Sequence, residues 1–175
     1  MTATVRRAMI ADAPALAEVA AATFALACPP HVTQESIATF IRDVLSRERF
    51  EEYLADESRV LFLAETDRPA GYAMLVLGEP ADPDVSSVLT RRPTAELSKI
   101  YVLPEGHGSG LSAQLMAASI EAAREAGAAG VWLGVNQENE RAQRFYTKSG
   151  FTRVGTKRFL VGARYEDDYV FEQGL

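Results

Sequence analysis

The chain has 175 residues and a formal net charge of −6; 47% of its residues are hydrophobic and 24% are charged. This length suits one domain, and the composition and acidic balance argue against a disordered chain and against non-specific nucleic-acid binding. A single cysteine, Cys28, argues against disulfides and thiolate metal sites. Because neither a signal sequence nor an apolar run of roughly 20 residues is evident, we expect one cytoplasmic domain, residues 1–175, without a membrane span or metal.

The first 77 residues alternate between apolar runs of strand and helix periodicity. The predicted elements are a strand over 4–8, helices over 12–27 and 33–57, and strands over 59–65 and 71–77. Asp12 and Thr33 are the expected helix caps, and Pro29 ends the first helix. The turn at 67–69 joins the last two strands into a hairpin.

Residues 78–95 contain three prolines and little periodicity. A loop longer than about 12–15 residues is uncommon in a compact domain and is often functional. The segment is therefore either a flap on the substrate side, a contact between subunits, or a surface loop without a role.

The second half of the chain predicts a regular alternation of strands and helices. The predicted elements are a strand over 96–103, a helix over 108–126, a strand over 130–135, a helix over 139–149, and strands over 151–160 and 165–172. The strand over 130–135 is continuously apolar, which is typical of a central strand, and its Trp132 is expected in the core. The order of elements indicates an α/β domain with a mixed sheet.

Three alternating glycines precede the helix over 108–126: Gly106, Gly108 and Gly110. A Walker-type phosphate loop needs Lys after its last glycine, where this chain has Leu111. A nucleophile elbow needs glycines two residues before and after its serine, and Ser109 lacks both. The remaining interpretation is a helix N-terminus whose backbone N–H groups bind a pyrophosphate, with a plain strand–helix turn as the alternative.

A dinucleotide-binding fingerprint is the closest competing motif, because Gly108, Gly110 and Ala113 match G-x-G-x-x-A. Two features disagree with it. Pro104 and Glu105 intervene between the strand and the glycine run, and Asn136 stands after the next strand, where an acidic residue would bind the ribose.

The helix over 139–149 presents an unusual combination on one face. At about 100° per residue, Asn139, Ala142 and Tyr146 lie close together on it. The small alanine lets a linear ligand lie near the helix, and the phenol is a potential proton donor. Phe145 lies off this face and is expected in the core.

These two segments together resemble the GNAT superfamily of N-acetyltransferases. The family's loop, V-x-P-x-x-R/Q-G-x-G-hydrophobic-G/A, corresponds to residues 102–112, and its later motif, N-x-x-A-x-x-F-Y-x-x-x-G-F, to residues 139–151. The chain departs from the family at His107, where Arg or Gln is usual, and at Ser112, where Gly or Ala is usual. Both positions act largely through backbone N–H groups in the family, so we expect CoA binding to survive.

The resemblance implies a mixed, largely antiparallel sheet of six to seven strands, flanked by helices and splayed between the fourth and fifth strands. It implies acetyl-CoA as cosubstrate and a primary amine as acceptor, and the layout is most similar to bacterial small-molecule acetyltransferases of the polyamine-acetylating type. A homodimer is also expected. The residues expected to bind acetyl-CoA are Tyr101, Val102, Leu103, His107, Gly108, Ser109, Gly110, Leu111, Ser112, Asn136, Asn139, Ala142 and Tyr146.

The expected reaction is direct attack of the amine on the thioester, with a backbone N–H near Val102 or Leu103 polarising the carbonyl. Glu96 is the candidate base, acting through water, with a solvated strand-end carboxylate as the alternative. Tyr146 would protonate the thiolate, with a packed aromatic as the alternative. Asn139 would bind the pantetheine arm, unless it caps its helix.

Two further residues were weighed for roles in the reaction. Cys28 has no evident base beside it and is expected to be a buried, inert thiol rather than a nucleophile. His31 is either a substrate contact or a surface histidine. The competing functions are a protein N-terminal or lysine acetyltransferase, and a non-catalytic acyl-CoA-binding protein.

Overall fold

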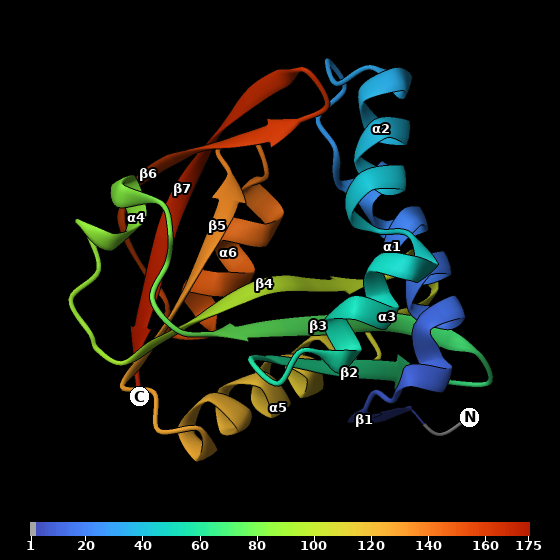
Figure 1. The fold of residues 1–175 in the computed structure, drawn as a ribbon, viewed down its shortest axis with the longest axis horizontal. Coiled ribbons are helices and arrows are strands. Elements are labelled where there is room, and N and C mark those ends of the chain that lie inside the picture. The colour runs from blue at the N-terminus through green and yellow to red at the C-terminus, as the bar shows by residue number, and fades with distance from the viewer. Residues whose placement is uncertain (1–2) are drawn as a thin grey trace.

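A computed structural model describes residues 3–175 as a seven-stranded sheet with helices on both faces (Figure 1). The strands are β1 (Thr4–Arg7), β2 (Arg59–Glu65), β3 (Pro69–Leu77), β4 (Thr94–Val102), β5 (Gly130–Asn136), β6 (Thr152–Val161) and β7 (Arg164–Gly174). The helices are α1 (Ala13–Ala27), α2 (Gln34–Val44), α3 (Arg47–Ala55), α4 (Pro83–Ser86), α5 (Leu111–Glu125) and α6 (Glu140–Lys148), with 3-10 turns at Ile10–Asp12 and Pro104–Gly106.

The sheet has the order β1-β2-β3-β4-β5-β7-β6, and its pairs are antiparallel except β4–β5. The parallel pairing of β4 with β5 covers only Thr94–Glu96 against Gly130–Trp132. β5 instead pairs with β7 along its whole length. The two central strands therefore separate after Glu96, and the expected mixed, largely antiparallel sheet with a splay between its fourth and fifth strands is confirmed.

Two apolar cores hold the helices on opposite faces of the sheet. The apolar side of α5, with Leu111 and Leu115 fully buried, packs on one face. Helices α1, α2 and α3 cover the other through Leu16, Phe40 and Phe50. The sheet is thus buried on both sides, and the separation of β4 from β5 opens a passage between the two faces.

The helical caps differ partly from the sequence expectation. Thr33 caps α2 as expected, because its hydroxyl accepts a hydrogen bond from the Ser36 N–H. Asp12 does not cap α1; its carboxylate binds the Arg6 guanidinium and the Met9 N–H instead. The expected single helix over 33–57 is two helices, because Ser46 caps α3 separately.

The segment 78–95 is folded onto the sheet. Its short helix α4 brings Val85 into a small core with Trp132 and Val170. The Glu172 carboxylate accepts hydrogen bonds from the backbone N–H groups of Thr90 and Arg91. None of its residues lines the cavity at the separation of β4 from β5, so the segment is not a flap over that cavity.

The stretch Ile10–Ala27 is long and apolar enough, by length and composition alone, to cross a membrane, with a mean hydropathy of 1.4 over 18 residues. This corrects the expectation that no such run exists. In the structure, however, the stretch packs as a core helix, because Leu16, Ala20 and Phe24 are buried against the sheet.

Candidate active site

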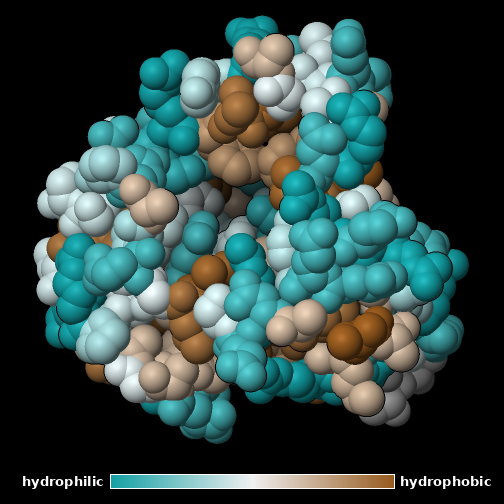
Figure 2. Space-filling model, viewed as in Figure 1, coloured by the Kyte–Doolittle hydropathy of each residue, from teal (hydrophilic) through white to brown (hydrophobic). Residues whose placement is uncertain are grey.

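A cavity of about 470 Å³ occupies the place where β4 and β5 separate. Figure 2 shows the surface hollowed between α2 and the β6–β7 hairpin. One side, here called the loop half, comes from the glycine loop, α5 and α6: Pro104, His107, Ser112, Asn139, Ala142 and Tyr146. The other side, the hairpin half, comes from α1, β6 and β7: Phe24, Cys28, Lys157, Phe159, Glu166 and Asp168. Strand β4 lies between the halves.

The glycine loop leaves backbone donors free at the start of α5. Gly108 and Gly110 adopt φ values of +82° and +84°, and an added Cβ at either would meet no atom within 4 Å. The N–H groups of Gly106, His107 and Ser109 bind carbonyls of the loop itself. The N–H groups of Gly108 and Gly110 make no such bond within residues 3–175, and no side chain caps α5. Free N–H groups at the start of a helix are what an anion requires, and the expected binding of a pyrophosphate here stays a prediction.

His107 and Arg141 form a pair beside this loop. The Arg141 guanidinium lies 3.0 Å from His107 Nδ1, and His107 Nε2 lies 3.0 Å from the Val102 carbonyl oxygen. Because a guanidinium only donates, Nδ1 must accept and Nε2 must carry the hydrogen. Arg141 thus supplies a cation next to the position where the family usually has Arg or Gln. The sequence motif gave no reason to select Arg141.

Of the two residues of β4 and its end expected to offer a free backbone N–H, Val102 and Leu103, only Val102 does so. The Leu103 N–H donates to the Ala70 carbonyl oxygen at 2.7 Å, so Leu103 offers no free donor. Hydrogen-bonding direction alternates along an antiparallel pair, and Gly71 is paired with Val102. The Val102 N–H therefore points away from β3, toward the space that β5 has left.

Helix α6 brings its expected residues to the cavity. The Asn139 side-chain oxygen accepts the Ala142 N–H and caps the helix, which is the alternative role considered for it. Its amide nitrogen remains available to a ligand. Asn136 also lines the cavity, and its side-chain oxygen accepts the Glu138 N–H.

Tyr146 is buried beside Phe151 and Phe171, yet it also lines the cavity. Its hydroxyl forms no hydrogen bond to any group of residues 3–175. Burial, aided by nearby Tyr101, raises the pKa of Tyr146 well above its usual value, so the phenol stays protonated. A protonated, unbound hydroxyl facing a cavity is the state that a proton donor requires.

Glu96 is the last residue of β4 that pairs with β5, and it lines the cavity. Burial raises the pKa of its carboxyl group, while Lys99 and Lys157 nearby lower it. A half-buried carboxylate with a raised pKa is a stronger base than an exposed one. The expected alternative, a solvated carboxylate at the strand end, does not describe this position.

Tyr101 lines the cavity from β4, and its predicted contact with the cofactor stays a prediction. Its ring lies 6.1 Å, between ring centroids, from Tyr72 in the core under α1. Burial, with contributions from Asp168 and Cys28, raises the pKa of Tyr101 to about 12.

The hairpin half contains charged groups that the sequence analysis did not select. Asp168 is buried, and burial raises its pKa to about 6. Glu166 binds His31 Nε2 at 2.6 Å and so joins the α1–α2 loop to β7. A period of two along β7 places Glu166, Asp168 and Glu172 on one face, and this alternation was the available signal.

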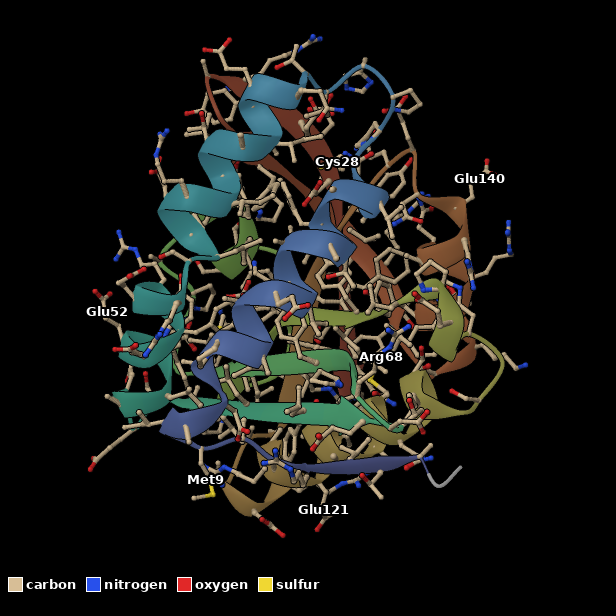
Figure 3. All side chains as sticks on the ribbon, turned by 90° about the vertical axis from the view of Figure 1, so that its right-hand side faces the viewer. Met9, Cys28, Glu52, Arg68, Glu121 and Glu140 are labelled. Carbon is tan, nitrogen blue, oxygen red and sulfur yellow. The ribbon has the colours of Figure 1, made fainter. Side chains whose placement is uncertain are left out.

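Cys28 lies where α1 ends, and Glu140 lies where α6 begins (Figure 3). Burial and nearby Glu166 raise the pKa of the Cys28 thiol to about 11. Cys28 is thus a protonated thiol, and a role as nucleophile is not supported. His31 contacts Glu166 and, at 3.4 Å, Glu138.

Residues 23–151 match the family model described as "Acetyltransferase (GNAT) family". An uncharacterized N-acetyltransferase of Mycobacterium tuberculosis is 49% identical over 165 residues, covering 94% of this chain and 98% of the relative. A PaiA N-acetyltransferase from Thermoplasma acidophilum, solved in complex with coenzyme A, has a TM-score of 0.78 at 20% identity and full coverage of both chains. A ribosomal-protein-alanine N-acetyltransferase from Brucella melitensis has a TM-score of 0.73 at 22% identity, covering 98% of this chain and 99% of its own. At these identities the two structures show a shared fold.

Proposed function

The chain belongs to the acetyltransferase (GNAT) family and is an acetyl-CoA-dependent N-acetyltransferase, and from this premise we propose that its acceptor is the primary amine of a small molecule. The observation that carries the proposal is the size of the cavity, about 470 Å³. The His31–Glu166 contact joins the α1–α2 loop to the β6–β7 hairpin beside it. A small amine fits such a space better than an extended peptide does.

Acetyl-CoA would lie in the loop half. The free N–H groups of Gly108 and Gly110 would bind the pyrophosphate, as in other helix N-termini that bind phosphate. Ala142 would leave room for the pantetheine arm, and the Asn139 amide nitrogen would bind it. The residues proposed to contact the cofactor, mostly through the backbone, are Val102, His107, Gly108, Ser109, Gly110, Leu111, Ser112, Asn136, Asn139, Ala142 and Tyr146; no metal is needed.

The proposed reaction is a direct transfer. Glu96 takes a proton from the acceptor ammonium through water, and the neutral amine attacks the thioester carbonyl carbon. The Val102 N–H stabilises the negative charge that develops on the carbonyl oxygen. The carbon–sulfur bond then breaks, Tyr146 donates its proton to the departing thiolate, and the nitrogen loses its second proton through water, which also returns a proton to Tyr146. The products are the acetylated amine and free CoA.

Three finer predictions belong to this proposal. The reaction takes place in the cytoplasm, where acetyl-CoA is available as a cosubstrate. A homodimer stays a prediction, as does the polyamine-type acceptor. Acetylation of a protein N-terminus or lysine is the second candidate, because the Brucella melitensis neighbour is named as a ribosomal-protein-alanine N-acetyltransferase.

Release of free thiol from acetyl-CoA tests the proposal against a panel of polyamines, amino acids, aminoglycosides and short peptides. We expect turnover with at least one small amine and little with peptides that end in a free α-amine. Turnover of the peptides alone would establish the second candidate. Titration of CoA alone, followed by calorimetry, is the control that separates a missing acceptor from a missing cofactor site.

A further inference from the structure

Four charged side chains line the cavity near the separation of β4 and β5. Glu96 and Lys99 come from β4, Lys157 from β6 and Asp168 from β7. Lys157 and Asp168 are directly paired across the two strands, and Asp168 is paired in turn with Asn136 of β5. Directly paired residues lie on the same face of a sheet, so these groups face one space.

The four charges form no ion pair with one another. Within residues 3–175, neither Lys99 nor Lys157 forms an ion pair with a carboxylate. Asp168 is only 5% exposed, and its buried Oδ1 has no hydrogen-bond partner in that part of the chain. A buried charged group without a partner is costly, and a ligand that paired with Asp168 would offset that cost.

Gly134 marks where two of these charges approach the sheet. It is exposed although it lies in the middle of central strand β5, because the cavity reaches the sheet there. A Cβ built at Gly134 would lie 3.2 Å from Asp168 Oδ2, 3.3 Å from Lys157 Cδ and 3.8 Å from Lys157 Nζ. A carboxylate and an ammonium therefore both reach the same bare stretch of β5 without forming an ion pair, and a larger side chain at this position would crowd them.

We propose that the acceptor carries an anionic group as well as its amine, with Asp168 binding the ammonium and Lys99 and Lys157 binding the anion. The inference rests on the proposed small-molecule acceptor and names its class, a zwitterion such as an amino acid. A diamine would meet Asp168 but would leave both lysines unmatched. The remaining part of the acceptor would contact the apolar wall formed by Phe24, Val32 and Phe159.

The surroundings of Lys99 agree with this assignment. Burial lowers its pKa, and Glu96 only partly offsets that effect. The ammonium also lies 5.7 Å from the centre of the Phe40 ring. A bound anion would restore the partner that this desolvated ammonium lacks.

Matched pairs of acceptors test the inference: ornithine against putrescine and lysine against cadaverine, which differ by a carboxylate. The expected result is a kcat/KM higher by about tenfold or more for the amino acid, the size expected of hydrogen bonds to a charged group. Equal or faster acetylation of the diamines would overturn the zwitterion while leaving the small-amine function intact. Absence of turnover with every amine, despite CoA binding, would overturn both.

The Lys157→Gln variant locates the anion site. It should reduce the preference for the amino acid over its diamine by about tenfold, with little change in the KM for acetyl-CoA. Arg158→Gln is the matched control, because it removes a positive charge from the adjacent exposed position of β6. An unchanged preference in Lys157→Gln would remove Lys157 from the site. The wild-type preference is a separate measurement that does not depend on how the variants fold.

Discussion

The two halves of the cavity are built from different parts of the chain and by different means. The loop half comes mainly from one stretch, residues 102–146, and offers backbone N–H groups, a small alanine and a neutral phenol. The hairpin half is assembled from residues as distant in sequence as Phe24 and Asp168, and its chemistry lies in charged side chains. The proposed cofactor site in the loop half can therefore rely on the backbone of one local segment. The proposed acceptor site in the hairpin half depends instead on how distant strands align.

Tyr146→Phe removes the hydroxyl proposed as the proton donor and should have the largest effect. Loss of the proton donor should lower kcat by about 100-fold or more, with little change in the KM for acetyl-CoA. Thiol release under saturating acetyl-CoA measures it. Tyr165→Phe removes a hydroxyl from an exposed tyrosine of β7 and is the control. Wild-type kcat in Tyr146→Phe would assign the protonation to another group.

Asp168→Asn tests how the buried carboxylate of the hairpin half affects the folding stability of the protein. The folded-state pKa of Asp168, about 6, lies above the ordinary value of 3.8. The folded protein therefore binds this proton more tightly than the unfolded chain, and the ionised group opposes folding above about pH 6 by up to about 3 kcal/mol. The variant should raise Tm at pH 8, and this gain should shrink between pH 6 and pH 4.

The exposed neighbour provides the control for this measurement. Asp167→Asn removes a carboxylate from the opposite face of β7, so it should change Tm little at either pH. A gain in Tm for Asp168→Asn that is equal at pH 4 and pH 8 would show that the carboxylate charge is not its cause. Loss of acetylation with a gain in Tm would show a group retained for function at the expense of stability.

Gly110→Ala tests the loop half and should have the smallest effect. The positive φ of +84° should cost about 1 kcal/mol in folding free energy with any L-residue. The added methyl group would also stand where a phosphate approaches the α5 N-terminus, so we expect CoA to bind about tenfold more weakly. Calorimetric titration measures the Kd.

Gly127→Ala is the matched variant, since Gly127 has a φ of +86° and open space at the opposite end of α5. It should lose the same folding stability without any change in CoA affinity. Equal weakening of CoA binding by both variants would mean that strain in α5, not access to its N-terminus, is responsible.

The elements of the loop half could be predicted because their signals are local. The alternating glycines require backbone conformations that few residues adopt, and Asn139 and Tyr146 are related by helical periodicity. The order of strands and helices was also predictable from apolar periodicity, with β4 and β5 within two residues of their expected bounds. The resemblance of these segments to the family supplied the splay.

The charged groups of the hairpin half could not be predicted in the same way. Lys157 and Asp168 belong to strands whose polar residues look like a solvated face, and their burial depends on β7 lying between β5 and β6. Arg141 was missed because its contact with His107 joins residues 34 positions apart. The sequence left the role of the 78–95 segment open between a flap, a subunit contact and a surface loop, because Glu172, its anchor, comes 82 residues after Thr90.

The hydrogen bond from His107 Nε2 to the Val102 carbonyl oxygen makes the unpaired edge of β4 unequal in its donors and acceptors. At this residue the outward carbonyl is already occupied, whereas the outward N–H is open. At Val102 a ligand therefore finds a hydrogen-bond donor and no free acceptor. A ligand carbonyl group can bind there more readily than a ligand N–H group. The histidine that stands at the family's usual Arg or Gln position thus determines which backbone group of Val102 an incoming ligand meets.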